Sequence, residues 1–165
     1  MSQELIIIRG NSGSGKSTTA KKLQQEMGYE TMLIQQDVVR REILRVRDTD
    51  RNPSIEMILD MALYGKHVGY DVIIEGILVN KRYGNMLRSI ISEFDEVYVY
   101  YLDISFNETL RRHNLKPNAH EFGEKEMRDW WLERDLLGVE GELTITDDVN
   151  EDEVLHIIKK DLSLD

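Results

Sequence analysis

The chain contains no cysteine, and this absence excludes two kinds of structure at once. Without thiols it can form neither a disulfide scaffold nor a thiolate metal site such as a zinc ribbon. A chain without disulfides suits a reducing compartment, and no basic leader precedes the first apolar segment. We therefore expect a cytoplasmic protein.

Long hydrophobic runs are also missing. The longest apolar stretches, such as residues 5–8 and 72–74, have the length of strands, whereas a membrane-spanning helix needs about 20 apolar residues. We therefore expect no membrane association. The chain has 165 residues, of which 41% are hydrophobic and 32% charged, as is ordinary for a globular protein. Because no linker or repeat interrupts it, we expect a single domain over residues 1–165.

A surplus of positive charge is missing too. Asp and Glu number 31 against 21 Lys and Arg, so the formal net charge is −10. Nucleic-acid binding by counterion release needs a basic surface, which argues against an extended nucleic-acid interface. The densest basic stretch, residues 40–51, is either a solvated helix with internal ion pairs or a patch that recognises an anion. Nothing in the composition indicates an oligomeric state.

Strand-like and helix-like segments alternate along the chain. Strands are predicted at residues 5–9, 31–35, 72–78, 96–104 and 142–146, and helices at residues 17–27, 55–63, 106–114, 124–137 and around 154–158. This alternation is typical of a parallel sheet that is covered by helices on both faces. We predict an α/β three-layer fold with a five-stranded parallel sheet.

One motif carries specific chemistry. Residues 10–17 match the pattern G-x-x-x-x-G-K-[ST], with a strand before and a helix after it. The glycines let several backbone N–H groups point at one phosphate, Lys16 reaches the β- and γ-phosphates, and the Ser17 hydroxyl is a Mg²⁺ ligand. We therefore predict a site for Mg²⁺ and ATP. Its nucleotide-binding residues are Gly10, Asn11, Ser12, Gly13, Ser14, Gly15, Lys16, Ser17 and Thr18.

A phosphate loop alone does not separate a kinase from a GTPase switch or a mechanical ATPase. The chain has no N-K-x-D-like motif for guanine, and its third predicted strand ends without the paired carboxylates of hydrolytic motors. It is also too short for the added helical domain of ring ATPases. These absences favour a small phosphotransferase.

Asp37 follows the second predicted strand directly, so it is expected at the carboxyl edge of the sheet, where ligands of open α/β folds gather. A carboxylate there can accept the proton of an acceptor hydroxyl as that oxygen attacks the γ-phosphate. Asp37 is also a candidate N-cap for a helix that starts at Val38. The two roles are compatible.

Together these segments resemble the small P-loop phosphotransferases related to polynucleotide kinase, chloramphenicol phosphotransferase, gluconate kinase and zeta toxin. The resemblance rests on residues 10–18, on Asp37-Val38-Val39-Arg40 and on a lid-like segment at about residues 112–130. It implies a P-loop kinase-like fold, an acceptor hydroxyl held by Asp37, and an acceptor bound by Arg40 or Arg41. The stretch 120–131 is similar to that of uncharacterised bacterial kinases.

Kinases of this group close a basic lid over the phosphates, often with two arginines one helical turn apart. The matching pair here is Arg112 and Lys116, and the lysine keeps the charge but loses the bidentate fork. We expect Arg112 to act in transfer and both residues to contact ATP. Arg111 and Arg128 are rivals, with Arg128 a candidate acceptor contact.

Two further features lie near the expected site. Glu75 comes at the end of the third predicted strand, where it is expected to face the acceptor or the metal, or else to make a structural hydrogen bond. Trp130 and Trp131 are neighbours on a predicted helix, so only one can point into the core. Core packing is the first interpretation, and stacking on a substrate ring is the alternative.

The sequence thus predicts an ATP- and Mg²⁺-dependent phosphotransferase that acts on a hydroxyl of a small-molecule acceptor. The acceptor itself is left open. A regulatory ATPase that acts through a partner and a toxin-like nucleotide-sugar kinase are the alternatives.

Overall fold

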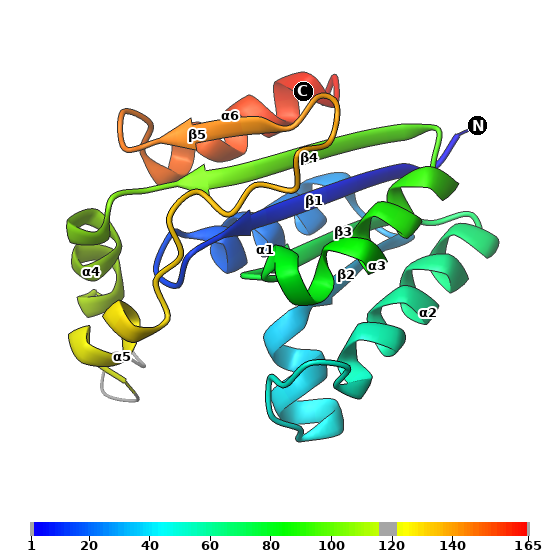
Figure 1. The fold of residues 1–165 in the computed structure, drawn as a ribbon. Helices are drawn as coiled ribbons and strands as arrows, with labels where there is room; N and C mark the ends of the chain where they lie inside the picture. The colour runs from blue at the N-terminus through cyan, green and yellow to red at the C-terminus, as the bar shows by residue number, and fades with distance from the viewer. Residues whose placement is uncertain (1, 116–121, 165) are drawn as a thin grey trace.

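The structure is a computed structural model that describes residues 2–115 and 122–164 (Figure 1). Its strands are β1 (Glu4–Gly10), β2 (Thr31–Gln35), β3 (Asp71–Gly76), β4 (Glu96–Asp103) and β5 (Leu143–Thr146). Its helices are α1 (Lys16–Met27), the π-helical turn η1 (Val38–Leu44), α2 (Pro53–His67), α3 (Asn80–Glu93), α4 (Phe106–Asn114), α5 (Glu124–Asp129) and α6 (Glu151–Asp161).

The five strands form one parallel sheet in the order β2-β3-β1-β4-β5. β1 lies at the centre, where Ile7 is aligned with Ile74 of β3 on one side and Val99 of β4 on the other. This arrangement confirms the predicted α/β fold with a five-stranded parallel sheet. Because β1 is central, the loop that follows it emerges in the middle of the carboxyl edge.

Helices cover both faces of the sheet (Figure 1). The side chains of β1 alternate between the two layers, as the period of two in a strand requires. Ile6 and Ile8 pack with α1 and α6, whereas Leu5 and Ile7 pack with α2 and α3. The near-continuous apolar run of β1 is therefore the signature of a strand buried on both faces.

Helix α3 was not predicted. Its buried positions are Tyr83, Met86, Leu87 and Ile90, which have the spacing of three and four that marks a helix face. Charged and polar residues separate these positions, and Gly84 lies among them. The helical spacing of apolar residues was therefore present in the sequence and was missed.

The predicted helix at residues 124–137 is wrong beyond Asp129. The backbone of Leu132 is instead bonded to the side chain of Asn11: its N–H donates to Oδ1 (2.9 Å) and its carbonyl accepts from Nδ2. Further along, Asp135 pairs with Arg9, whose Nη2 lies 2.8 Å from Oδ2. Residues 130–142 therefore run along the sheet because distant polar side chains satisfy groups that a helix would have used.

The third strand also ends earlier than predicted, at Gly76. Beyond it the N–H of Leu78 donates to Gln36 Oε1 (2.8 Å), and the carbonyl of Leu78 accepts from Arg9 Nη2 (2.9 Å). These side-chain partners replace the strand ladder and turn the chain into α3. None of the helices in residues 2–115 and 122–164 combines the length and the apolar character of a membrane span.

Candidate functional site

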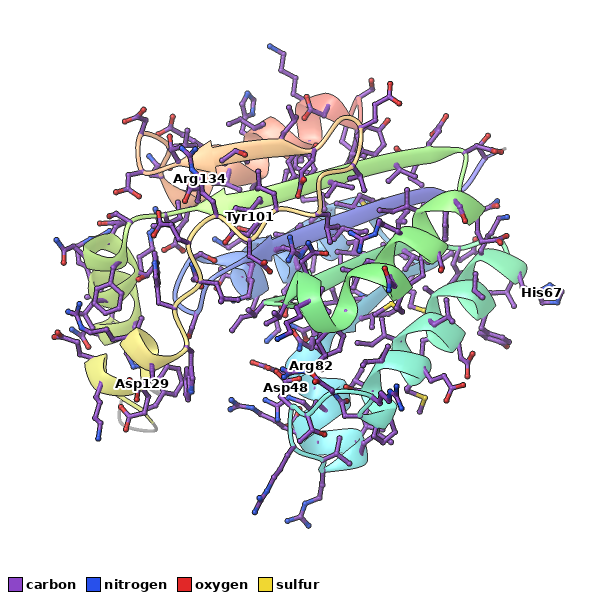
Figure 2. The ribbon with its side chains drawn as sticks, viewed as in Figure 1. Asp48, His67, Arg82, Tyr101, Asp129 and Arg134 are labelled. Atoms are coloured by element: carbon purple, nitrogen blue, oxygen red, sulfur yellow. The ribbon has the colours of Figure 1, made fainter. Side chains whose placement is uncertain are left out.

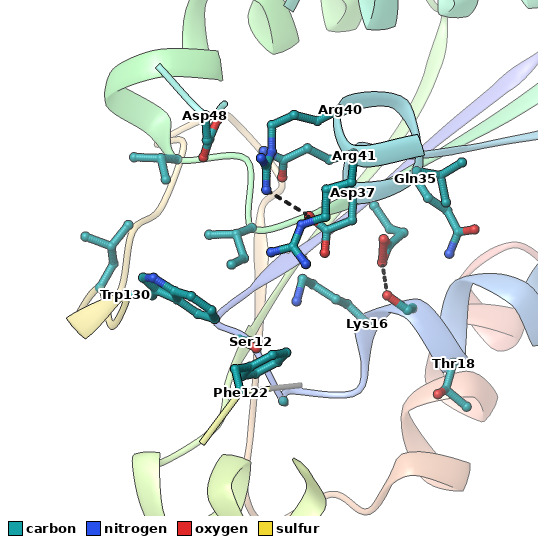
Figure 3. Close-up of a pocket in the computed structure, with 18 of the residues that line it drawn as sticks. Ser12, Lys16, Thr18, Gln35, Asp37, Arg40, Arg41, Asp48, Phe122 and Trp130 are labelled. Carbon is teal, nitrogen blue, oxygen red and sulfur yellow. Dashed lines mark hydrogen bonds and ion pairs between the residues drawn. The ribbon is translucent and has the colours of Figure 1, made fainter. Parts of the chain in front are cut away.

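A cavity of about 890 Å³ opens at the carboxyl edge of the sheet (Figure 3). Its lining joins the loop after β1, the start of α1, the ends of β2 and β3, η1, and the segment on either side of α5. The lining residues are Ser12, Gly13, Lys16, Ser17, Thr18, Lys21, Gln35, Gln36, Asp37, Val38, Arg40, Arg41, Asp48, Glu75, Ile77, Val79, Arg82, Phe122, Trp130 and Leu132.

Two glycines let the loop after β1 take its shape. Gly13 and Gly15 have φ values of +83° and +95°, in the left-handed region that other residues adopt only under strain. A Cβ built on Gly13 would lie 2.6 Å from the carbonyl oxygen of Thr109, so the loop also packs against α4 too closely for any side chain. Backbone shape therefore favours glycine at both positions, and close packing also requires it at Gly13.

The loop ends at the start of α1, which is suited to bind phosphate. Gly15 precedes this helix without a side-chain cap, and the first turn contains no acidic residue. Its N–H groups and positive dipole end therefore face the cavity without a built-in carboxylate. Lys16 is 9% exposed, and its Nζ donates to the carbonyl of Asn11 at 3.2 Å, which keeps the ammonium beside the loop. These donors fit a triphosphate.

Ser17 and Glu75 form a direct pair on the cavity floor. The Ser17 hydroxyl donates to Glu75 Oε2 at 2.8 Å, and Glu75 is 2% exposed. Burial raises the pKa of Glu75, while Lys16 and the hydrogen bond from Ser17 oppose this rise. A hydroxyl beside a buried carboxylate is an oxygen donor set that suits Mg²⁺. Among the described residues, no cluster of three or more His, Asp or Glu side chains could hold a metal by itself.

The burial of Glu75 leads to a stability prediction. Because its pKa is raised in the folded state, the unfolded chain ionises first as pH rises above about 4.5, and this favours unfolding. The parent therefore loses stability as the pH rises from about 4.5 to the raised pKa of Glu75 in the folded protein. The Glu75→Gln variant does not lose this stability, because Gln cannot ionise. We expect the nucleotide-free variant to melt higher than the parent at pH 7 and 8, with the difference shrinking toward pH 4.5.

Thermal unfolding over this pH range measures the effect. The matched control is Glu93→Gln, because Glu93 is exposed at the end of α3 and its replacement removes the same charge without removing a buried one. If Glu75→Gln melts below the parent at pH 7, the contacts of the Glu75 carboxylate with Ser17 and Lys16 stabilise the fold by more than its desolvation costs.

Asp37 lies in the cavity beside two arginines. Its Oδ1 is 3.9 Å from Arg40 Nη2 and 4.0 Å from Arg41 Nε, and its side chain is 64% exposed. The carboxylate makes no capping hydrogen bond to η1, so the capping interpretation is wrong. A π-helical turn over Val38–Leu44 carries both arginines, and such turns are frequent at functional sites.

Several lining side chains were missed or misread in the sequence, among them four that are large or charged. Asp48 and Arg82 come together from segments far apart in the chain, with Arg82 Nη1 3.3 Å from Asp48 Oδ2 (Figure 2). Trp130 is 41% exposed at the cavity, so its interpretation as a core residue is wrong. Its ring centroid lies 5.1 Å from that of Phe122. Spacing gives no signal for Arg82, because only the turn after β3 brings it here.

Other predicted residues lie behind the cavity. Asn11 is 6% exposed, and its amide is bonded to Leu132, as described above. Arg112 is 4% exposed: its Nη1 donates to the carbonyl of Ser14 (2.9 Å) and its Nε to Glu108 (3.0 Å). Hydrogen bonds from Arg111 and Arg112 hold the pKa of Glu108 at about 2, so this carboxylate stays charged beside both. Arg112 thus supports the loop from outside.

Two further cations, Arg128 and Lys116, were predicted to contact ligands from the lid-like segment. Arg128 pairs with Glu124 (2.8 Å) and lies over the ring of Phe106 at 4.2 Å, and it is not among the described lining residues. Lys116 lies outside the residues that the structure describes. Their roles, and that of Arg112 in transfer, stay predictions.

The charge of the cavity is opposite to that of the chain. The lining contains the cations Lys16, Lys21, Arg40, Arg41 and Arg82 against the carboxylates Asp37, Asp48 and Glu75. The whole chain, by contrast, has a formal net charge of −10. A cationic hollow in an anionic protein attracts anions locally, which suits phosphorylated ligands.

Comparison with known proteins agrees with this geometry. The family model described as "AAA domain" matches residues 5–130. No curated protein sequence matches the chain. Among solved structures, the APS kinase CysC of Mycobacterium tuberculosis in complex with AMPPNP and APS is 16% identical, covers 98% of each chain and has a TM-score of 0.72.

Two other solved structures are similar over nearly their whole length. The tunicamycin resistance protein of Deinococcus radiodurans is 15% identical over 99% of this chain and 98% of its own, with a TM-score of 0.66. A gluconokinase of Sinorhizobium meliloti is 17% identical over 97% and 95%, with a TM-score of 0.62. At such identities the likeness establishes the fold.

Proposed function

The chain belongs to the AAA domain family and is a small P-loop kinase-like protein, and from this premise we propose that it is an ATP- and Mg²⁺-dependent phosphotransferase. It moves the γ-phosphate of ATP to a hydroxyl of a small-molecule acceptor. One observation carries the proposal: the phosphate loop and the carboxylate of Asp37 open into the same cavity. A donor of phosphate and a base for an acceptor hydroxyl can therefore meet there.

The donor side of the cavity is assigned to the loop. The backbone N–H groups of residues 13–17 and the ammonium of Lys16 bind the β- and γ-phosphates. Ser17 and Glu75 hold Mg²⁺, with Ser17 as a ligand and Glu75 beside it. When bound, the metal neutralises charge on the phosphate oxygens. Glu75 is thus assigned to the metal side rather than to the acceptor.

The acceptor side is assigned to Asp37, Arg40 and Arg41. Asp37 accepts the proton of the acceptor hydroxyl while the acceptor oxygen forms its bond to the γ-phosphorus. The bond from that phosphorus to the β–γ bridging oxygen breaks, and ADP leaves with the bridging oxygen. Arg40 and Arg41, already close to Asp37, keep the carboxylate oriented and provide donors for the acceptor.

The segment at residues 112–130 is assigned as a lid. Gly13 packs against α4 through the carbonyl of Thr109, and Arg112 is bonded to the loop carbonyl of Ser14. A movement of α4 would therefore also shift the phosphate loop, because the two are in contact. Arg112 is a positioning residue in this arrangement, and a contact with ATP would require the segment to move.

A screen of candidate acceptors with γ-labelled ATP tests the proposal. Sugars, nucleosides, nucleotides, nucleotide sugars and aminoglycoside or phenolic antibiotics are offered with Mg²⁺, and transfer of label to one class is the expected result. Release of labelled phosphate without transfer to any acceptor would instead favour a regulatory ATPase. Transfer confined to nucleotide sugars would favour the toxin-like kinase.

Arg41→Ala provides a prediction on the acceptor side. Arg41 lines the cavity near Asp37, so its loss should raise the acceptor's KM by about tenfold while leaving the KM for ATP nearly unchanged. Steady-state kinetics with each substrate varied in turn measures both constants. Arg47→Ala is the matched control, because Arg47 is exposed in the same basic stretch but is not among the lining residues. A rise confined to the KM for ATP would move Arg41 to the nucleotide side.

A further inference from the structure

The ring of Trp130 is partly exposed at the wall of the cavity. It is 41% exposed, and it meets the ring of Phe122 at a tilt of 58°. Figure 3 shows both rings across the open space from Arg40 and Arg41. A large apolar surface that faces a charged hollow is costly in water, and such surfaces mark contacts with ligands. Trp130 therefore offers a stacking surface inside the cavity.

Its neighbour Trp131 behaves differently. The ring of Trp131 packs edge-on against Phe106 at 5.4 Å, and its Nε1 donates to Glu133 at 3.1 Å. Among the described residues, it does not line the main cavity. Phe122 is supported from behind by His113, whose ring is stacked on it at 4.4 Å. The aromatic surface at the cavity is thus built from Trp130 and Phe122 and does not continue to Trp131.

Contacts within the protein hold the arginine side chains at the cavity before any ligand binds. Arg82 donates through Nε to Asp50 at 3.0 Å, and its Nη1 lies 3.3 Å from Asp48. Asp48 itself accepts from the buried hydroxyl of Tyr83 at 2.6 Å. Since a guanidinium has five N–H groups, these contacts leave donors of Arg82 for a ligand. The hydrogen bond from Tyr83 to Asp48 and the ion pair between Asp48 and Arg82 together keep the guanidinium of Arg82 at the cavity.

Arg40 also has unused hydrogen-bonding capacity. Its Nη1 donates to the carbonyl of Val46 at 3.2 Å, which anchors the side chain. Its Nε is buried and has no hydrogen-bond partner among the described residues. Buried donors without partners are rare in folded proteins and mark strain or an absent ligand. Arg40 and Arg82 are therefore two anchored cations at one cavity.

We propose that the acceptor carries both a flat unsaturated ring and an anionic group, as a nucleoside monophosphate does. The ring stacks on Trp130 and Phe122, and the anion binds Arg40 and Arg82. This inference rests on the proposed function and narrows its acceptor to one chemical class. An uncharged sugar has neither a flat unsaturated ring nor an anionic group.

Calorimetry on the intact protein tests the two surfaces separately. The phosphate loop is first saturated with Mg²⁺ and a non-hydrolysable ATP analogue, so that added ligands meet only the acceptor side. The probes are the four ribonucleoside 5′-monophosphates, their nucleosides and ribose 5-phosphate. We expect the tightest-binding monophosphate to bind about tenfold or more tightly than its nucleoside and than ribose 5-phosphate.

Two variants assign the effects. Trp130→Leu should reduce the affinity for that monophosphate to the level of ribose 5-phosphate and leave ribose 5-phosphate binding unchanged. Trp131→Leu, the matched control, should change neither affinity. Arg82→Gln should reduce the monophosphate to the level of its nucleoside. In the Trp131→Phe protein, where Trp130 is the single tryptophan, stacking should also quench fluorescence as the monophosphate is added.

Each remaining outcome contradicts the inference. If ribose 5-phosphate binds as tightly as the monophosphate, the base ring does not contribute to binding. If the nucleoside binds as tightly as the monophosphate, the anionic group does not contribute. If none of the probes binds, neither the inferred ring site nor the inferred anion site exists. Transfer of label to an uncharged acceptor without a ring would overturn the inference but leave the phosphotransferase standing. Failure of the ATP analogue to bind would overturn the proposed function itself.

Discussion

Lys16→Ala is expected to lower the rate of phosphoryl transfer by at least about a hundredfold. Lys16 is the cation of the phosphate loop. Its ammonium donates a hydrogen bond to the carbonyl of Asn11, and the residue is largely buried. Charge spreads over the γ-phosphate oxygens as transfer proceeds, so an ammonium at this place stabilises the transition state more than the ground state. A hundredfold loss corresponds to about 2.7 kcal/mol of barrier.

Single-turnover transfer of label to the acceptor found in the screen measures the rate. Lys22→Ala is the matched control, since Lys22 is on the same helix but is half-exposed and lies 3.8 Å from Asp152, outside the cavity. Its activity should stay close to that of the parent. Thermal unfolding of both variants checks that they are folded. Normal transfer by a folded Lys16→Ala protein would remove the central claim about the loop.

Asp37→Asn is expected to lower the transfer rate by about 10²–10⁴ while binding Mg·ATP almost as well as the parent. The loss, roughly 3–5 kcal/mol of barrier, comes from the carboxylate that orients the acceptor hydroxyl and takes its proton. Asparagine keeps the size of the side chain, and Asp37 makes no capping hydrogen bond, so the fold should be unaffected. Calorimetry with a non-hydrolysable ATP analogue measures nucleotide binding, and labelled transfer measures the rate.

Asp37 also pairs with Arg40 and Arg41, and the effect of losing these pairs must be separated from that of losing the base. Arg41→Ala serves as the control, because it breaks one of the pairs and keeps the carboxylate. It should change the acceptor's KM with little effect on kcat. If Asp37→Asn weakens nucleotide binding by more than about tenfold and transfers at a near-normal rate, Asp37 belongs to the metal site and the acceptor assignment is wrong.

Several parts of the site are local in sequence, and these were predictable. The phosphate loop is contiguous, and its glycines, Lys16 and Ser17 are required by the geometry of one turn and the start of one helix. Asp37 lies two residues past the end of β2, and in a parallel sheet the carboxyl end of that strand lies at the ligand edge. Strong alternation of apolar segments was also enough to predict the sheet and its two helical layers.

The segment after α5 shows where such reasoning fails. Residues 130–137 have a helical pattern, yet hydrogen bonds from Asn11 and Arg9 hold them in an extended path. Asn11 and Arg9 lie more than a hundred residues earlier in the chain than their partners, so no short window of sequence contains both members of a pair. The same path places Trp130 at the cavity rather than in the core.

By itself, the sequence determined the fold class, the phosphate loop and the place of Asp37 just past β2, because each depends on neighbouring residues or on strand and helix periodicity. Only the tertiary structure decided which further side chains share the cavity. Arg82, Asp48 and Trp130 line one cavity because the segments that follow β3, η1 and α5 begin at the same edge of the sheet. Such meetings depend on packing between distant elements, which leaves no periodicity along the chain.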